Sequence, residues 1–138
     1  MEDRVDLLPA IPREQLLSEM AACDVFLFPS LRDGGGTVVI EAMALGRPVV
    51  CLNTGGPGMH ITEECGIKIT PSSPEATIHD LAGALARLYL DPDLRTRLGK
   101  AAHTRARQAY HWDRLGERLL KIYNNETTVS TAFDRRVA

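Results

Sequence analysis

Residues 25–52 decide the fold, and they run VFLFPSLRDGGGTVVIEAMALGRPVVCL. The stretch begins and ends with short, continuous apolar runs, Val25 to Phe28 and Pro48 to Leu52. Between these runs lie a glycine-rich loop and a compact apolar segment, Thr37 to Leu45, which Gly46 can end as a helix. Strands that are apolar at every position are typical of parallel sheets covered by helices on both faces. The stretch therefore predicts a strand, a helix and a second, parallel strand.

The flanking segments continue this alternation of strand and helix. Residues 5–8 predict a short strand, and residues 13–22 place apolar side chains at helical spacing. After the central stretch, residues 53–58 predict a loop rich in glycine and proline, and residues 66–69 a strand near the edge of the sheet. The pattern indicates an α/β protein. Two strong and two weak strands fall short of the roughly five or six of a complete doubly wound domain, so we expect a domain truncated at its N-terminus.

The C-terminal half predicts three helices. Ser72 is expected to cap the first, with Pro74 in its first turn. Asp91 and Pro92 start the second, and a third, amphipathic helix runs from about Trp112 to Tyr123. The apolar stripe expected on the first helix comprises Ile78, Leu81, Ala82, Leu85 and Leu88. The chain beyond these helices is polar and carries no period.

Length and composition bound the class of protein. The 138 residues fit one domain, which we expect over residues 1–124, followed by a polar, disordered tail over 125–138. Sixteen Lys and Arg against eighteen Asp and Glu give a net charge of −2 without a basic tract, which argues against a nucleic-acid partner. The apolar runs are much shorter than the ~20 residues that span a bilayer. Any membrane association is therefore expected to be peripheral at most.

The cysteines and histidines predict neither disulfides nor a metal site. Three cysteines, none of them in a C-x-x-C arrangement, are typical of a reducing cytoplasm. The four histidines lack metal-ligand spacing, and surface or packing roles explain them best. His60 stands apart because it follows the second glycine-rich loop. Basic residues between Arg95 and Arg107 are expected to form a solvated helix face.

Two glycine-rich loops are the candidates for chemistry. Residues 30–36 and 53–58 follow predicted strands, and parallel α/β sheets bind ligands outside the carboxyl ends of their strands. The first loop leads directly into a helix at about Thr37, where backbone N–H groups without a neighbouring Cβ suit an anion such as a diphosphate. The alternative is a connector that needs glycine for its turn alone.

Glu41 strengthens the case for a ligand. It lies one turn into a helix that is otherwise apolar on nearly every face, where an unsatisfied carboxylate costs several kcal/mol. Its sequence neighbours supply no cation, since Arg47 lies beyond the end of the helix, so a pair of ligand hydroxyls is a suitable partner. The alternative is a partly exposed glutamate at the helix edge. Asp33, eight residues earlier, is expected to face the same cleft.

The residues from Phe28-Pro29-Ser30 through Asp33-Gly34-Gly35-Gly36 to Val50 resemble the signature of group 1 glycosyltransferases. The family pattern is similar to P-S-x-x-E-G-x-G-x-x-x-x-E-A-M-A-x-G-x-P-V-V, with two glutamates separated by seven residues. Gly55-Gly56 resembles the next loop of the family, and His111-Trp112 its usual aromatic-Trp pair. The resemblance covers about residues 5–123. It implies a Rossmann-like sheet with helices on both faces, the C-terminal domain of the GT-B fold.

The resemblance also implies the site residues. Glu41 matches the glutamate that holds the ribose hydroxyls of the nucleotide, and Asp33 the catalytic-site glutamate that contacts the transferred sugar. The matching donor-binding loop comprises Gly34, Gly35, Gly36 and Thr37. Asp33 is one methylene shorter than the usual Glu, Gly35 stands where a bulky residue is common, and Met59 stands where many members have Glu.

The implied function is sugar transfer, with retention, from a nucleotide-diphospho-sugar such as a UDP- or GDP-sugar, without metal or other cofactor. The chain resembles the last two thirds of a donor-binding domain, so the acceptor-binding N-terminal domain and the basic pair at the leaving diphosphate are expected to be missing. We expect the fragment alone to be inactive and to form homo-oligomers. The alternatives are a non-catalytic nucleotide-binding or interaction module and a sugar-nucleotide epimerase of the same fold.

Overall fold

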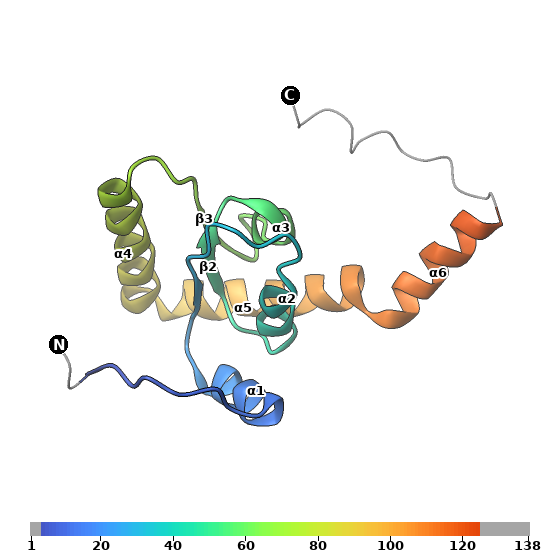
Figure 1. Ribbon diagram of the computed structural model, residues 1–138, viewed down its shortest axis with the longest axis horizontal. Helices are drawn as coiled ribbons and strands as arrows, with labels where there is room; N and C mark the ends of the chain where they lie inside the picture. The colour runs from blue at the N-terminus through green and yellow to red at the C-terminus, as the bar shows by residue number, and fades with distance from the viewer. Residues whose placement is uncertain (1–3, 125–138) are drawn as a thin grey trace.

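The computed structural model describes residues 4–124, which form a three-stranded parallel sheet with helices on both faces (Figure 1). The strands are β1 (Phe26–Phe28), β2 (Val49–Leu52) and β3 (Gly66–Ile69), in the spatial order β1-β2-β3. Phe26 lies opposite Val49, which lies opposite Gly66. The predicted α/β class, the parallel sheet and the edge position of residues 66–69 are confirmed.

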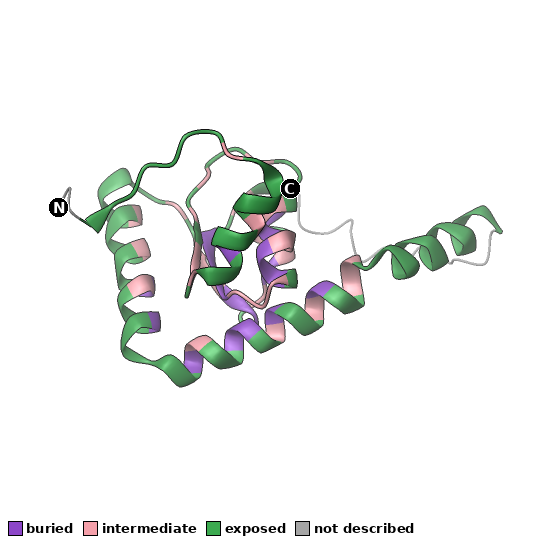
Figure 2. Cartoon of the chain, turned by 90° about the horizontal axis from the view of Figure 1, so that it is seen from below, coloured by how far each residue is buried: buried purple, intermediate pink, exposed green. Residues whose placement is uncertain are grey.

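The central strand β2 anchors both layers of the core, and all four of its residues are buried. On one face, Val49 and Cys51 pack against α2 (Thr37–Ala44) and the second half of α5 (Pro92–Tyr110). On the other face, Val50 packs against α4 (Pro74–Leu90) and the first half of α5. The long helix α5 therefore serves both layers, and Figure 2 shows its buried stripe turned towards the sheet.

Most helix boundaries follow their sequence signals. Helix α1 (Arg13–Ala22) agrees with its predicted span. Helix α2 ends just before Gly46, whose φ of 71° is the left-handed conformation that glycine adopts without strain. Helix α5 begins at the predicted position because Asp91 Oδ1 accepts a 2.8 Å hydrogen bond from the Leu94 amide. The last helix, α6 (Trp112–Tyr123), also forms as predicted.

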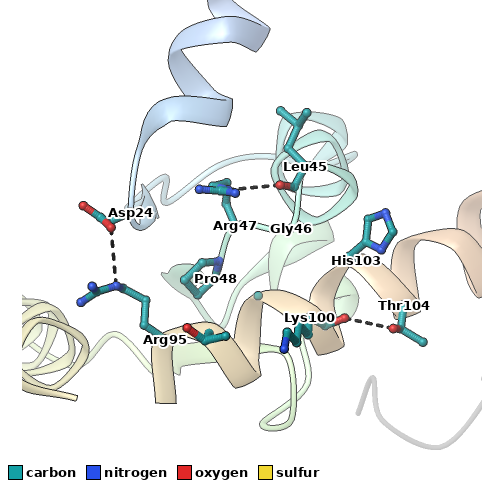
Figure 3. Close-up of a pocket in the computed structure, with 11 residues that line it drawn as sticks. Asp24, Leu45, Gly46, Arg47, Pro48, Arg95, Lys100, His103 and Thr104 are labelled. Carbon is teal, nitrogen blue, oxygen red and sulfur yellow. Dashed lines mark hydrogen bonds and ion pairs between the residues drawn. The ribbon is translucent and has the colours of Figure 1, made fainter. Parts of the chain in front are cut away.

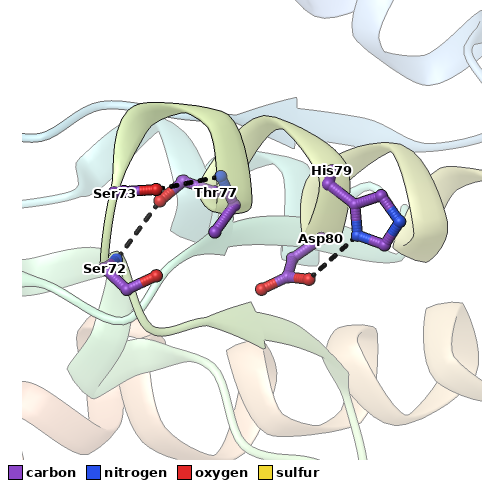
Figure 4. A network of polar contacts seen from close by, with 6 residues as sticks. Ser72, Ser73, Thr77, His79 and Asp80 are labelled. Atoms are coloured by element: carbon purple, nitrogen blue, oxygen red, sulfur yellow. Dashed lines mark hydrogen bonds and ion pairs between the residues drawn. The ribbon is translucent and has the colours of Figure 1, made fainter.

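The cap of α4 differs from the prediction by one residue. Ser73 caps the helix: its Oγ accepts from the Ala76 amide at 3.2 Å, and its carbonyl accepts from the Thr77 amide at 2.9 Å (Figure 4). Ser72 lies outside the helix, where its amide donates to Thr77 Oγ1 at 3.3 Å. The first-turn proline decides between the two serines, because Pro74 fits the first helical position directly after Ser73.

The buried face of α4 is also rotated from the predicted stripe. Ala84 and Leu88 are buried and Leu81 and Leu85 are half-buried, whereas Ile78 is 68% exposed. Positions 81, 84, 85 and 88 lie within one narrow arc at 3.6 residues per turn, and Ile78 falls on its flank. Ala82 lies farther round the helix and is exposed.

Two expectations for the N-terminal segment are wrong. The predicted strand at residues 5–8 does not form, and Val5 and Leu7 are 62% and 91% exposed, because no described strand pairs with this segment. Strand β1 is not buried on both faces, since Leu27 is 38% exposed. Helix α2 covers the face that carries Phe26 and Phe28, whereas α4 packs on β2 and β3 and leaves Leu27 uncovered.

Residues 53–58, predicted as a loop, contain the start of a short helix, α3 (Gly55–His60). Pro57 lies in its first turns, where a missing N–H leaves no helical hydrogen bond unmade. The Gly58 amide donates to the Thr54 carbonyl at 3.1 Å and the Ile61 amide to the Pro57 carbonyl at 3.2 Å. The high content of glycine and proline in this segment is the reason that the sequence did not predict the short helix.

Helix α6 stands away from the sheet and is exposed along its whole length (Figures 1 and 2). Within residues 4–124, no helix combines the length and the apolar character that a bilayer crossing requires. The predicted tail at 125–138 lies outside the described residues.

Candidate functional site

The two glycine-rich segments meet at the carboxyl ends of β1 and β2, as parallel topology predicts. The Gly56 amide donates to the Asp33 carbonyl at 3.0 Å. A Cβ on Gly56 would lie 2.6 Å from the Gly35 carbonyl carbon, and one on Gly55 would collide with the Asp33 carbonyl oxygen. The absence of side chains thus allows the backbones of the two segments to touch, and they form one surface.

The first loop requires a glycine at position 36. Gly36 adopts φ 62° at the N-terminal boundary of α2, a left-handed conformation that disfavours other residues. A Cβ at Gly36 would lie 2.9 Å from the Pro57 nitrogen and 3.0 Å from His60 Cδ2. In contrast, a Cβ on Gly34 or Gly35 would meet nothing within 4 Å. The glycine at position 35 therefore leaves open space where a bulky residue is common in the family that the sequence resembles.

Asp33 turns its carboxylate towards its own loop. Oδ1 accepts hydrogen bonds from the Gly35 amide at 2.9 Å and from the Gly36 amide at 2.6 Å. Two consecutive amides that converge on one oxygen form a small anion-binding concavity. No side chain caps α2, and the amides of Thr37 and Val38 in its first turn have no acceptor among the described residues. The loop therefore presents its N–H groups to negative charge.

Glu41 has a cationic partner that the sequence analysis missed. Arg13, 28 positions earlier on α1, places Nη2 at 2.7 Å and Nη1 at 2.9 Å from Glu41 Oε1. The sequence neighbours of Glu41 supply no cation, but α1 packs against α2 in the tertiary fold and brings Arg13 to this carboxylate. The Glu41 side chain is 29% exposed and that of Arg13 is 65% exposed, so this pair contributes little to stability, about 0.2–1 kcal/mol. Oε2 of Glu41 has no hydrogen-bond partner among the described residues.

The two carboxylates are engaged by different partners: Asp33 binds the loop amides and Glu41 binds Arg13. Both stem from the Ser30–Ala44 segment that follows β1. They do not contact each other in this structure.

A basic cavity lies at the opposite, amino end of the strands. It is open to solvent, has a volume of about 730 Å³, and is lined in part by Asp24, Arg47, Arg95, Lys100 and His103 (Figure 3). The guanidinium of Arg47 donates to the Cys23 and Leu45 carbonyls, and that of Arg95 donates to the Leu88 carbonyl at 2.8 Å. Through these hydrogen bonds, Arg47 links the N-terminal side of β2 to the end of α1, and Arg95 links α5 to the end of α4. The expectation that the basic residues of α5 form a solvated face is therefore wrong for Arg95, whose side chain is 26% exposed.

The described residues hold no cluster of three or more histidine, cysteine or acidic side chains suited to a metal ion. Burial raises the pKa of the Cys51 thiol to about 11. Because a thiol with so high a pKa is protonated at neutral pH, Cys51 acts as a small apolar core residue.

Comparison with known proteins assigns the chain to a family. The family profile of the glycosyl transferases group 1 matches residues 1–105. The chain is 32% identical over 126 residues to the D-inositol 3-phosphate glycosyltransferase of Corynebacterium glutamicum, covering 91% of this chain and 29% of that protein. It is 28% identical over 133 residues to a GDP-mannose-dependent monoacylated alpha-(1-6)-phosphatidylinositol monomannoside mannosyltransferase of the same species, covering 91% and 34%.

Solved structures show the same architecture. Sucrose-phosphate synthase from Thermosynechococcus elongatus matches with a TM-score of 0.75 and 32% identity, over 90% of this chain and 30% of that one. Anabaena HepE in complex with UDP matches in fold with a TM-score of 0.69 and 24% identity, over 78% and 29%. These likenesses confirm the predicted GT-B class of fold. The chain belongs to the group 1 glycosyltransferase family, and it spans about a third of the length of these relatives.

Proposed function

We propose that this chain is the donor-binding part of a retaining glycosyltransferase, which transfers a sugar from a nucleotide-diphospho-sugar to an acceptor. The observation that carries the proposal is the contact between the two glycine segments at the carboxyl ends of β1 and β2, with uncapped amides at the start of α2 and Glu41 about one turn further on. The names of the relatives agree with such a donor: one is GDP-mannose-dependent, and HepE is described with UDP and with UDP-glucose.

In this proposal the loop binds the diphosphate. Helix N-termini and convergent backbone amides favour anions, and the loop already holds one anionic oxygen, Asp33 Oδ1. Rotation of the Asp33 side chain towards the transferred sugar would release the amides of Gly35 and Gly36 for a phosphate oxygen. Gly34, Gly35, Gly36 and Thr37 then form the donor-binding loop, and Asp33 is the catalytic-site residue at the sugar.

Glu41 binds the ribose in the same proposal. A carboxylate accepts two hydroxyl hydrogens, and Oε2 is open while Oε1 holds Arg13. The surface pair with Arg13 is weak enough for a ligand to compete with it. Arg13 is therefore the counter-ion of the Glu41 carboxylate in this structure.

Sugar transfer in this account proceeds by electrostatic stabilisation of the leaving diphosphate, without metal or other cofactor, in the cytoplasm. In the proposed full enzyme, an N-terminal domain binds the acceptor, and the basic pair at the leaving diphosphate comes from the first third of the donor-binding domain. Because catalysis requires both reactants to be positioned together, we expect the isolated chain to bind donor and to transfer no sugar. Formation of a glycosylated product by the purified chain would contradict this.

Asp33→Asn tests the donor assignment. The amide oxygen of Asn can still accept from the loop, so binding of UDP and GDP should stay within about twofold of the wild type. Binding of the intact donors UDP-glucose and GDP-mannose should weaken, because the charged contact to the sugar is lost. Calorimetric titration of all four ligands into both proteins measures this. Equal affinity of the wild type and the variant for every nucleotide sugar would remove Asp33 from the site.

One observation favours the alternative, a non-catalytic nucleotide-binding module of the same fold. Asp33 is shorter than the usual glutamate and is held by its own loop at 2.6 and 2.9 Å. A module of this kind would bind the nucleotide and its sugar conjugate equally well, so the same titration distinguishes the two functions.

A further inference from the structure

His60, at the C-terminal end of α3, joins three parts of the chain. Its Nε2 lies 2.7 Å from the Gly35 carbonyl oxygen, and its Nδ1 lies 2.9 Å from the Tyr110 hydroxyl at the end of α5. The imidazole and phenol rings meet edge to face, with centroids 5.1 Å apart. The His60 carbonyl accepts a 2.8 Å hydrogen bond from Arg105 Nε. Both the backbone and the ring of His60 are therefore fixed by α5.

The contacts also fix the hydrogen positions on the ring. A backbone carbonyl can only accept, so Nε2 carries the hydrogen that it donates to Gly35. In the neutral ring Nδ1 is then an acceptor, and the Tyr110 hydroxyl donates to it. His60 thus keeps one tautomer because each ring nitrogen has its own partner.

The Gly35 carbonyl belongs to the same peptide group as the Gly36 amide. In a trans peptide the C=O and N–H point in opposite directions from one plane. His60 binds the carbonyl side of this group, while the amide side points at Asp33 Oδ1. Since both flanking residues are glycines, the side-chain barriers that resist a flip of this peptide group are absent. A flip would turn the carbonyl oxygen towards Asp33 Oδ1, to which the Gly36 amide now donates its hydrogen bond.

We propose that His60 is a positioning residue that locks the Gly35–Gly36 peptide group with its N–H towards the anion site, and that Tyr110 holds the ring in place. The inference rests on the proposed function only in what it says about nucleotide binding. Its structural part concerns the orientation of one peptide group and can be measured without a ligand.

Two substitutions separate hydrogen bonding from packing. His60→Gln places an amide nitrogen near the position of Nε2 and can still donate to the Gly35 carbonyl, whereas His60→Leu fills space without donating. We expect the Gly36 amide to exchange its hydrogen about tenfold faster in His60→Leu than in the wild type, with His60→Gln restoring most of the protection. UDP or GDP affinity, measured by calorimetry, should follow the same order with a loss of about tenfold in His60→Leu.

Tyr110→Phe provides a mild second test, because it keeps the ring contact and removes the hydroxyl. The ring then loses its anchor at Nδ1, and Gly36 exchange should accelerate a few-fold while the melting temperature changes little. Unchanged Gly36 exchange in both His60→Leu and Tyr110→Phe, or equal behaviour of His60→Gln and His60→Leu, would overturn the proposal. If the wild type binds neither UDP nor GDP, the proposed function fails, while the exchange rates still decide the role of His60.

Discussion

At the scale of single residues, Gly36 and Gly35 differ sharply although they are neighbours in one loop. A Cβ on Gly36, which has a left-handed backbone, would meet Pro57 and His60, whereas a Cβ on Gly35 would lie in open space. A run of three glycines in the sequence does not reveal which one the fold requires. The distinction arises from α3, which packs against the loop from outside the motif.

This difference predicts the outcome of two matched substitutions. Gly36→Ala should lower the free energy of unfolding by at least about 2 kcal/mol, because a left-handed alanine alone costs roughly 1–2 kcal/mol and its Cβ also meets the Pro57 nitrogen. Gly35→Ala should change it by no more than about 0.5 kcal/mol. Urea denaturation of the two variants measures both values. A Gly35→Ala variant as unstable as Gly36→Ala would contradict the described loop geometry.

At the scale of elements, local sequence signals correctly predicted the helices and strands whose ends those signals determine. Gly46 and the apolar run before it predicted α2 and its end, and the four apolar residues 49–52 predicted β2. Helix α3 was missed because three glycines and a proline suppress every local helix signal, although tertiary contact stabilises the turn. The Arg13–Glu41 pair was missed for a related reason: a contact between residues 28 apart leaves no trace in local spacing. The proposed roles of Asp33, Glu41 and the loop glycines remain predictions.

The packing of α1 against α2 makes Arg13 a competitor of the proposed ribose ligand. Arg13→Gln removes the ion pair with Glu41, so the melting temperature should change little. Affinity for UDP or GDP should rise, by up to about fivefold, because the ligand no longer displaces a cation. Arg114→Gln is the matched control, since it breaks a similar exposed pair with Glu117 on α6. If calorimetry shows that nucleotide affinity falls in Arg13→Gln but not in Arg114→Gln, then Arg13 contacts the nucleotide directly. That result would contradict the proposal that Arg13 competes with the nucleotide for Glu41.

At the scale of the whole molecule, α6 is the helix whose apolar side chains are least covered by the rest of the chain. Along one side it carries Trp112, Leu119 and Ile122, which are 84%, 53% and 60% exposed. An uncovered apolar side of this kind marks a surface for association. The predicted homo-oligomer of the chain remains a prediction, and α6 is the surface that we expect it to use.

Light scattering tests this association directly. The chain at micromolar concentration should give a mass above the 15.2 kDa of one copy, and Leu119→Glu should reduce the mass to that of a monomer. Ile78→Glu, at an apolar position of α4 that is 68% exposed, should leave the larger species intact. A wild-type chain that scatters as 15.2 kDa throughout would show that α6 does not pair with a second copy.

The central claim is that Glu41 binds the ribose of a nucleotide, and its most direct test is calorimetric titration of UDP and GDP into Glu41→Gln. Loss of a hydrogen bond to an ionised group removes ~1.5–3 kcal/mol, so affinity should fall roughly 10–150-fold with a nearly unchanged melting temperature. Glu117→Gln, which removes another exposed carboxylate paired with an arginine, should bind as the wild type does. Equal nucleotide affinity in Glu41→Gln and the wild type, at the same melting temperature, would contradict the account.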